Sequence, residues 1–130
     1  MIRTLTVQTQ AREQLIDITR DVARAVTEFA TRDGVAVLHV PHTTAGVTIN
    51  ENADPDVVRD VLLALERAVP NHPEFRHAEG NSAAHVKSSL VGCGAQVLVE
   101  NGDLVLGTWQ SIFFCEFDGP RTRKVHVTVR

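Results

Sequence analysis

The sequence predicts an α+β fold in which the helices are segregated from layered, mostly antiparallel sheets. Strand-like segments occur in runs of two, two and four, and one helical segment and then two helical segments separate these runs. This order, ββαββααββββ, lacks the regular strand-helix alternation of a parallel sheet and is typical of α+β domains. A chain of 130 residues is long enough to bury a core, so we expect one domain over residues 1–130.

The first part of the chain predicts two strands, a helix and a third strand. Apolar and polar residues alternate over residues 2–9, which is the pattern of a half-buried strand. Residues 14–18 predict a second strand, antiparallel to the first. Apolar side chains at helical spacing predict a helix within residues 19–30. The nearly continuous apolar run at residues 35–40 predicts a central strand that is buried on both faces.

The later elements are marked by turn and capping residues. Asp54 and Pro55 suit the N-cap and the first position of a helix that ends near residue 69. The pair Asn101-Gly102 lies between two alternating runs and predicts a tight hairpin, because both residues tolerate a positive φ. Two further alternating or apolar segments follow, and we expect the last four strands to form an antiparallel meander.

The composition restricts the class of protein. With 43% hydrophobic residues, 22% charged residues and a formal charge of −3, the chain lacks the basic surface of nucleic-acid-binding proteins. It has no apolar run of about 20 residues for a membrane span and no apolar signal sequence at its start, so we expect a cytoplasmic protein without membrane or nucleic-acid partners. Cys93 and Cys115 are expected to be reduced, mostly buried thiols.

Residues 75–92 concentrate polar groups beside a predicted helix start. Ser82 suits the N-cap, and Val86 and Leu90, four residues apart, are expected to face the core. His85 then lies in the first turn, where free N–H groups and the positive end of the helix dipole favour anions. This stretch therefore predicts a site for a phosphate, a metal ion or both.

A second polar stretch begins with His42, Thr43 and Thr44 and ends with Asn50 and Glu51. Its residues lie at the two ends of a predicted strand, and the carboxylate and amide can bind an amine, a hydroxyl or a hydrated metal ion. A helix N-terminus follows directly, so this segment is the second candidate for a binding site.

Three histidines from separate segments can supply neutral imidazoles to one divalent ion. These are His42, His77 and His85, which would leave a coordination position open for water or substrate. We expect a divalent metal cofactor, Zn or Mg, at these residues. The alternatives are structural: His42 can cap its strand, and His77 can be a surface histidine.

The same segments carry a resemblance to a known family. The matching segments are His42–Pro55, Glu79–Asn81, Ala84–Leu90, Leu106–Gln110 and Asp118–Arg121. In order and spacing they resemble the YjbQ family, whose members are described as secondary thiamine-phosphate synthases. The resemblance implies an α+β sandwich, a homotrimer with sites near subunit interfaces, and the coupling of a pyrimidine pyrophosphate to a thiazole phosphate with release of pyrophosphate.

The polar residues and the resemblance together give an expected site for a small phosphorylated substrate. The expected catalytic residues are His85, Glu51 and Lys87. The expected substrate-binding residues are Thr43, Thr44, Asn50, Asn81, Ser89, Trp109 and Arg121. Arg121 and Lys87 would hold phosphate oxygens, the first as a planar fork and the second as a point charge.

Other interpretations of these residues remain open. Lys87 can be a solvated surface residue, Arg121 can form an interface ion pair, and Trp109 can pack in a core or interface. His39 and His126 are read as structural or strand-surface residues. At the level of function, the alternatives are a non-catalytic trimeric protein that binds a metal or a phosphorylated metabolite, and a metal-assisted hydrolase with a glutamate base.

Overall fold

The computed structural model describes residues 1–130 and has the predicted element order, ββαββααββββ, which confirms the α+β class. The strands are β1 (Arg3–Gln8), β2 (Gln14–Asp17), β3 (Gly34–His39), β4 (Ala45–Glu51), β5 (Gly94–Glu100), β6 (Asp103–Leu104), β7 (Gln110–Glu116) and β8 (Thr122–Val129). The helices are α1 (Thr19–Val26), α2 (Pro55–Ala68) and α3 (Ser82–Val91). None of these helices is long and apolar enough to cross a membrane.

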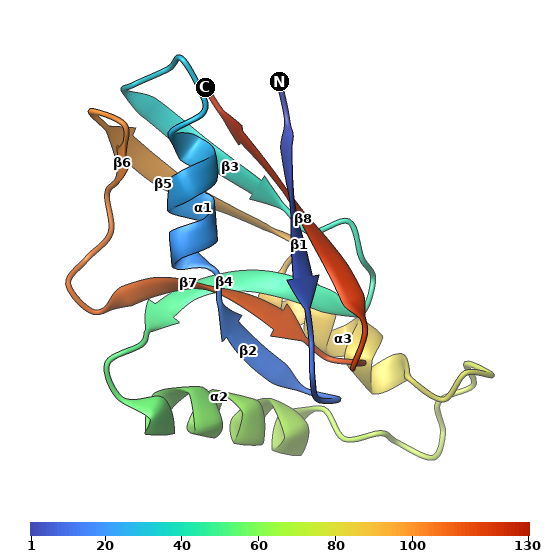
Figure 1. Cartoon of the computed structure of the whole chain (residues 1–130). Helices are drawn as coiled ribbons and strands as arrows, with labels where there is room; N and C mark the ends of the chain where they lie inside the picture. The colour runs from blue at the N-terminus through green and yellow to red at the C-terminus, as the bar shows by residue number, and fades with distance from the viewer.

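The strands form two antiparallel sheets, and the strands of one sheet cross the direction of the strands of the other (Figure 1). The order is β1-β8-β3-β5-β6 in the five-stranded sheet and β2-β7-β4 in the three-stranded sheet. Two predictions were wrong. β1 pairs with β8 rather than with β2, and the last four strands are not a meander, because β7 and β8 lie in different sheets. Strand pairing is set by distant partners, which local alternation does not identify.

Two apolar clusters lie on the two sides of the three-stranded sheet. The larger cluster joins α1, the inner face of the five-stranded sheet and one face of β7, and includes Val22, Leu38 and Phe114. The smaller cluster joins α3 to the other face of β7 through Ala84 and Cys115 and is flanked by α2. The three-stranded sheet is therefore the middle layer of the molecule.

The strand that is covered on both faces is β7 and not β3. In β3, Ala36 and Leu38 are buried, whereas Val35 and Val37 are only half-buried and His39 is exposed. Residues 112–116 of β7 are all buried. The prediction for residues 35–40 was wrong because no layer of this chain covers the outer face of the five-stranded sheet.

α3 buries a different face from the one predicted. Val86 and Leu90 are 38% and 64% exposed, whereas Ala84, Lys87 and Ser88 are buried. The small side chains allow a close approach to β4, and the Ser88 hydroxyl donates to the Ala45 carbonyl oxygen at 2.6 Å. Close packing of small residues thus prevails over the placement of the larger apolar residues.

The local signals for turns and caps were more accurate. The Asp54 side chain accepts a hydrogen bond from the Asp56 N–H at 2.9 Å, and Pro55 is the first residue of α2. Asn101 and Gly102 have φ values of 52° and 82° and connect β5 to β6, as the hairpin signal predicts. The N-cap of α3 is Asn81 rather than Ser82, a shift of one residue.

Candidate functional site

A polar cavity of about 440 Å³ lies where α3 begins and where β4 and β8 begin. Except for Pro41, every side chain that lines it is polar. The lining residues are Pro41, His42, Thr43, Thr44, His77, Glu79, Asn81, His85, Asp118, Arg121 and Arg123. A second cavity of about 510 Å³ shares His42, Thr43 and His85 with the first and adds Ser88, Ser89, Gly92 and Cys93. We call the two adjoining cavities the histidine groove; one end is rich in charge and the other is uncharged.

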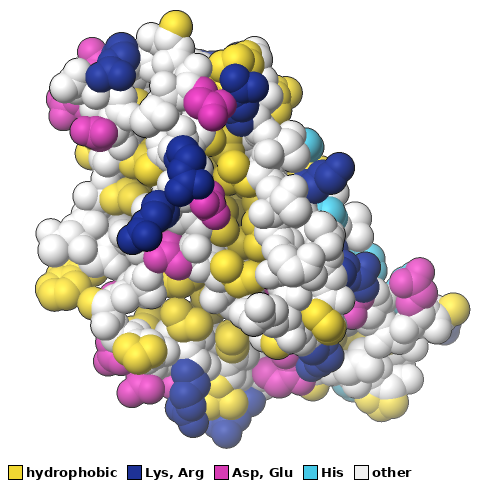
Figure 2. Space-filling view, in the orientation of Figure 1, with side chains coloured by type: hydrophobic (Ala, Val, Ile, Leu, Met, Phe, Trp, Pro, Cys, Tyr) yellow, Lys and Arg dark blue, Asp and Glu magenta, His cyan; other side chains and the backbone are white.

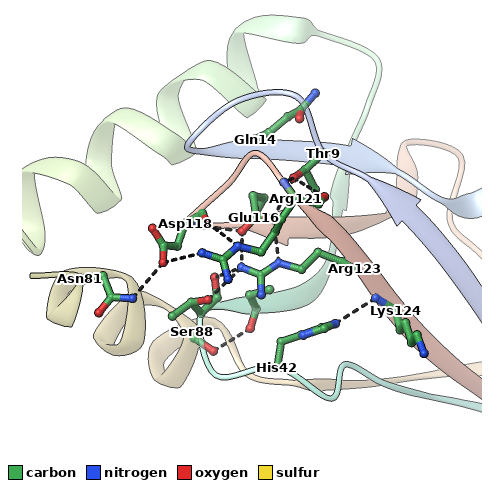
Figure 3. A network of polar contacts seen from close by, with 12 residues as sticks. Thr9, Gln14, His42, Asn81, Ser88, Glu116, Asp118, Arg121, Arg123 and Lys124 are labelled. Atoms are coloured by element: carbon green, nitrogen blue, oxygen red, sulfur yellow. Dashed lines mark hydrogen bonds and ion pairs between the residues drawn. The ribbon is translucent and has the colours of Figure 1, made fainter. Parts of the chain in front are cut away.

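Arg123 forms the floor of the charged end, and Figure 3 shows its contacts. The side chain is only 3% exposed. Its Nε donates to Glu116 Oε2 at 2.8 Å, and its Nη2 donates to the other carboxylate oxygen and to Thr44 Oγ1 at 2.8 Å. Burial opposes ionisation of Glu116, but the hydrogen bonds from Arg123, the Asp118 N–H and Thr9 outweigh it and lower the pKa of Glu116. The charged pair is therefore fixed in position.

One nitrogen of this buried guanidinium is left for a ligand. Nη1 of Arg123 makes no hydrogen bond to the protein, whereas Nε and Nη2 are fully engaged. The only fully buried side-chain nitrogen or oxygen atom without a partner is Asn81 Oδ1, so Nη1 keeps some exposure although the Arg123 side chain is 3% exposed. Because Arg123 lines the cavity, its free N–H donors are available to an anion there.

His42 contributes a neutral imidazole to the groove. Its Nε2 accepts a hydrogen bond from the Lys124 backbone N–H at 2.9 Å, so the neutral ring carries its proton on Nδ1. Burial lowers the pKa of His42, and the positive charge of Arg123 lowers it further. His42 is therefore a hydrogen-bond donor through Nδ1 at neutral pH.

His77 and His85 face each other across the mouth of the groove. Their ring centroids are 5.4 Å apart, and the rings meet edge to face. His85 comes from α3, whereas His77 comes from the exposed segment 70–80, which extends past α3 in Figure 1. Two imidazoles at this spacing can donate or accept protons on a substrate that lies in the groove.

Asp118 organises the remaining charged residues. Its Oδ2 accepts hydrogen bonds from Asn81 Nδ2 at 2.9 Å and from Arg121 Nη2 at 3.1 Å. The contact with the carboxylate fixes the orientation of the Asn81 amide, which leaves Asn81 Oδ1 as an unpaired acceptor. Arg121 is exposed and retains donors for a ligand.

The structure brings most of the predicted site residues together. Those that line the histidine groove are His42, Thr43, Thr44, His77, Asn81, His85, Ser89 and Arg121. Thr44 is buried, and its hydroxyl is occupied by Arg123, so it positions the guanidinium and has no free donor for substrate. The Ser89 hydroxyl donates to the His85 carbonyl oxygen at 3.0 Å.

Three predicted residues lie at the opposite end of the three-stranded sheet. Ala45 of β4 pairs with Glu116, whereas Glu51 pairs with Gln110, so the strand separates Glu51 from the groove by about 20 Å. Asn50 precedes Glu51, and Trp109, which is 63% exposed, precedes Gln110. Within one chain, the proposed roles of Asn50, Glu51 and Trp109 in the same site as His85 are not supported.

Lys87 is also outside the groove. Its side chain is 2% exposed, and its Nζ donates to Glu13 at 2.7 Å and to Glu66 at 2.5 Å. Lys87 follows His85 by two residues, which places it on a different face of α3. Within this chain, a lysine that is buried and paired with two carboxylates holds α3 against its neighbours and is not available to a phosphate, so the catalytic role of Lys87 stays a prediction without support from the geometry.

The three-histidine metal centre does not fit this geometry. No group of three or more His, Cys, Asp or Glu side chains is arranged to hold a metal ion. The Nε2 lone pair of His42 is engaged by the Lys124 N–H, and Nδ1 carries the proton, so neither nitrogen is free to bind a metal ion. His77 and His85 alone remain as candidate ligands in the groove, and the divalent cofactor stays a prediction.

Sequence reasoning missed Arg123 and Glu116. Residues 125, 127 and 129 of β8 are buried valines, and Arg123 lies on the same inward face of the strand. A charged residue in a buried position of an alternating strand is a signal for a satisfied or functional charge. Glu116 similarly ends the buried run of β7. These two exceptions to the apolar pattern could have been found from the sequence.

A larger cavity, of about 1080 Å³, lies elsewhere, between the β5–β6 hairpin and the segment that follows β6. It is lined by Arg32, Asp33, Glu100 and Asp103 among others, and Arg32 Nη2 donates to the Asn101 carbonyl oxygen at 2.9 Å. It contains no histidine. Its lining offers no convergent set of free donors comparable to that of the histidine groove.

Comparison with known proteins places this geometry in a family. The model of the family described as "UPF0047 protein YjbQ-like" matches residues 3–130. The chain is 54% identical to the UPF0047 protein YugU of Bacillus subtilis over 128 residues, which cover 98% of this chain and 97% of the relative. It is 52% identical to the UPF0047 protein MJ1081 of Methanocaldococcus jannaschii, over 95% of this chain and 89% of the relative.

Solved structures agree with this assignment. A crystal structure of a YjbQ/UPF0047 family protein from Clostridium acetobutylicum has a TM-score of 0.95 and 53% identity, with 98% of this chain and 99% of that chain covered. The hypothetical protein APE1520 from Aeropyrum pernix has a TM-score of 0.93 at 33% identity, with 100% and 98% covered. The chain therefore belongs to the YjbQ/UPF0047 family, because it shares the fold, the sequence and nearly the whole length of these proteins.

Proposed function

We propose that the chain is an enzyme that binds a small phosphorylated substrate in the histidine groove. The observation that carries the proposal is the buried guanidinium of Arg123, which Glu116 and Thr44 hold fixed while Nη1 is left free. Fixed donors can bind phosphate oxygens without reorganising, which makes them more effective than flexible surface charges. Arg121 and the N-terminal end of α3 add positive potential at the same end of the groove.

The reaction that we propose is the formation of thiamine phosphate, which the family resemblance leads us to expect. The bond between the pyrimidine methylene carbon and the pyrophosphate oxygen breaks, and pyrophosphate leaves with the electron pair. The thiazole nitrogen then forms the new C–N bond. Such a reaction requires that two anions are held close together and that water is kept away from a cationic carbon.

The groove supports these requirements through separate groups. Arg123 and Arg121 would hold phosphate oxygens, and His42 would donate from Nδ1. His85 and His77 would supply a proton to the departing pyrophosphate. The uncharged end would hold the less polar part of the substrate. The homotrimer expected from the resemblance also remains a prediction, which sedimentation of the purified protein would test.

The test is turnover by purified, tag-free protein with the two phosphorylated precursors, without added ions and then with Mg²⁺ or Zn²⁺ added separately. We expect the His85→Gln variant to lose about 100-fold in turnover, the usual contribution of one proton-transfer group. The matched control is His72→Gln, because His72 lies on the same exposed segment as His77 but outside the groove. This control should keep the wild-type rate.

The other outcomes distinguish the alternative functions. If wild-type protein shows no turnover but binds phosphate, and His85→Gln abolishes that binding, a non-catalytic binding protein for phosphorylated metabolites is the better interpretation. Ion-dependent hydrolysis of the precursors without coupling would favour a metal-assisted hydrolase. Equal turnover by wild type and His85→Gln would contradict the assignment of the groove as the active site.

A further inference from the structure

The outer face of the five-stranded sheet carries a second pair of histidines, which do not line the histidine groove. His39 of β3 lies directly opposite His126 of β8 in the antiparallel register. Their neighbours Leu38, Val125 and Val127 are buried on the inner face, so alternation directs both histidines to the outer face. Figure 2 shows histidine side chains emerging along the right-hand edge of the molecule.

The two imidazoles are already oriented together. Their ring centroids are 6.4 Å apart, and their planes differ by only 12°. Directly opposed residues of an antiparallel pair have Cβ atoms about 5 Å apart, so the rigid strands hold the two rings within reach of one ion. Gly94 pairs with His39 from the other side, on β5, and therefore places no side chain beside its ring.

A third strand, β1, contacts one of the two ring nitrogens of His126. Thr4 of β1 lies opposite His126, and its Oγ1 is 2.9 Å from His126 Nδ1. When this oxygen accepts the Nδ1–H, the lone pair of Nε2 is left free. Metal-binding histidines usually donate their second ring N–H to an oxygen in this way, which fixes the tautomer and the ring orientation.

The contrast with His42 is direct. Its Nε2 accepts a backbone N–H from Lys124, two residues before His126, and so that lone pair is not free. His126 has the opposite arrangement, with an oxygen at Nδ1 and no protein partner at Nε2. His42, in the loop between β3 and β4, and His126, on β8, therefore differ in their capacity to bind a metal ion.

We propose that His39 and His126 form a surface chelate for a divalent transition-metal ion, with Thr4 as the residue that orients His126. Imidazole nitrogen is a preferred ligand of Cu²⁺, Ni²⁺ and Zn²⁺, and Cu²⁺ binds most strongly in that series. Two protein ligands leave the other coordination positions to water or to an external ligand. Ligation requires the exposed His39 ring to turn until one of its nitrogens and His126 Nε2 both lie at the bonding distance of about 2 Å.

The experiment uses the full chain without a histidine tag. Cu²⁺, Ni²⁺ and Zn²⁺ are titrated separately by calorimetry into wild type, His39→Gln, His126→Gln, the groove variant His85→Gln and the control His72→Gln. We expect one ion per chain and a loss of at least about tenfold in affinity in each of the first two variants, with His72→Gln unchanged. Thr4→Val should lose about tenfold while both ligands remain, as removal of an orienting oxygen usually does.

A spectroscopic measurement separates ligation from a general effect on folding. Long-range ¹H–¹⁵N spectra of the imidazoles with Zn²⁺ should show His126 bound through Nε2 with its Nδ1 still protonated. Retention of wild-type affinity in both His39→Gln and His126→Gln would overturn the proposal. Loss of binding in His85→Gln alone would also overturn it, because the ion would then be bound in the histidine groove.

Discussion

α3 carries two polar regions that differ in how completely the protein satisfies them. Its N-terminal end contributes Asn81 and His85 to the histidine groove, where His85 contacts His77 edge to face. Its buried face contributes Lys87 to a cluster with Glu13 and Glu66, which we call the Lys87 cluster. The groove retains free donors and acceptors, whereas the ammonium group of Lys87 is 2% exposed and fully occupied.

The difference teaches that polar side chains in one short stretch need not share a role. Lys87 joins three segments that are distant in sequence: Glu13 follows β1, Glu66 is on α2, and Lys87 is on α3. None of the α2 residues is buried, so this cluster and the contact with Leu65 are important in holding α2 against the molecule. Unused hydrogen-bonding capacity is the property that distinguishes the groove.

The largest expected effect comes from removing the central charge of the Lys87 cluster. We expect Lys87→Met to lower the free energy of unfolding by about 3 kcal/mol, the lower end of the range for breaking a buried ion pair, since Glu66 is 45% exposed. Urea denaturation would measure this change. Phosphate binding in the groove should be retained under native conditions.

His85→Gln provides the matched comparison for this variant. We expect its unfolding free energy to stay within about 0.5 kcal/mol of wild type, as for other substitutions away from a packed core, while turnover falls about 100-fold. If Lys87→Met instead abolished phosphate binding at unchanged stability, the separation between the Lys87 cluster and the groove would be wrong.

A smaller effect should appear in the pH dependence of stability. Burial raises the pKa of Glu13 above its ordinary value of 4.5 although Lys87 opposes this. The folded chain therefore binds the Glu13 carboxyl proton more tightly than the unfolded chain does. The free energy of unfolding that this proton contributes is complete below pH 4.5 and is lost as the pH rises through the raised pKa of Glu13. The hydrogen bond from Lys87 lowers the pKa of Glu66, whose contribution is lost as the pH falls below 4.5.

Glu13→Gln isolates the first of these contributions. The stability of the variant relative to wild type should increase as the pH rises from 4.5, and at pH 7 it should lie within about 1 kcal/mol of wild type. Urea denaturation at several pH values from 4 to 7 would measure this difference. If the stability of Glu13→Gln relative to wild type instead fell as the pH rises, this would contradict the raised pKa of Glu13.

The smallest expected effect concerns the two thiols: Cys93 lines the histidine groove, and Cys115 lies in the apolar cluster beneath α3. Cys93 is exposed and lines the uncharged end of the groove, which corrects the expectation that both thiols are buried. Burial raises the pKa of Cys115 to about 12. At pH 8, only about 1 in 10,000 of the Cys115 thiols is therefore ionised, so one thiol per native chain should react with a disulfide reagent, and two in urea.

Protection experiments extend this prediction to the groove. A phosphorylated ligand should slow the reaction of Cys93 if it extends into the uncharged end. Rapid reaction of both thiols in the native protein would show that the cluster beneath α3 opens readily, and the contrast between the two regions would then be weaker than the structure indicates.

The sequence predicted most of the fold because its signals are local. The element order, the cap at Asp54 and the Asn101-Gly102 turn each depend on residues within a few positions of one another. The candidate site was predicted only in part. His42, His77 and His85 do line one groove, but the residues at the far end of β4 do not join them.

The sequence by itself determined the family, the order of the elements and the presence of a histidine-rich polar stretch. The tertiary structure alone decided that Arg123, held by Glu116, forms the floor of the groove, and that Lys87 is buried among carboxylates. Periodicity and capping arise from neighbouring residues, and they can be read along the chain. Convergence of Thr44, Glu116 and Arg123 depends on sheet register and on packing between distant segments, which no local pattern specifies.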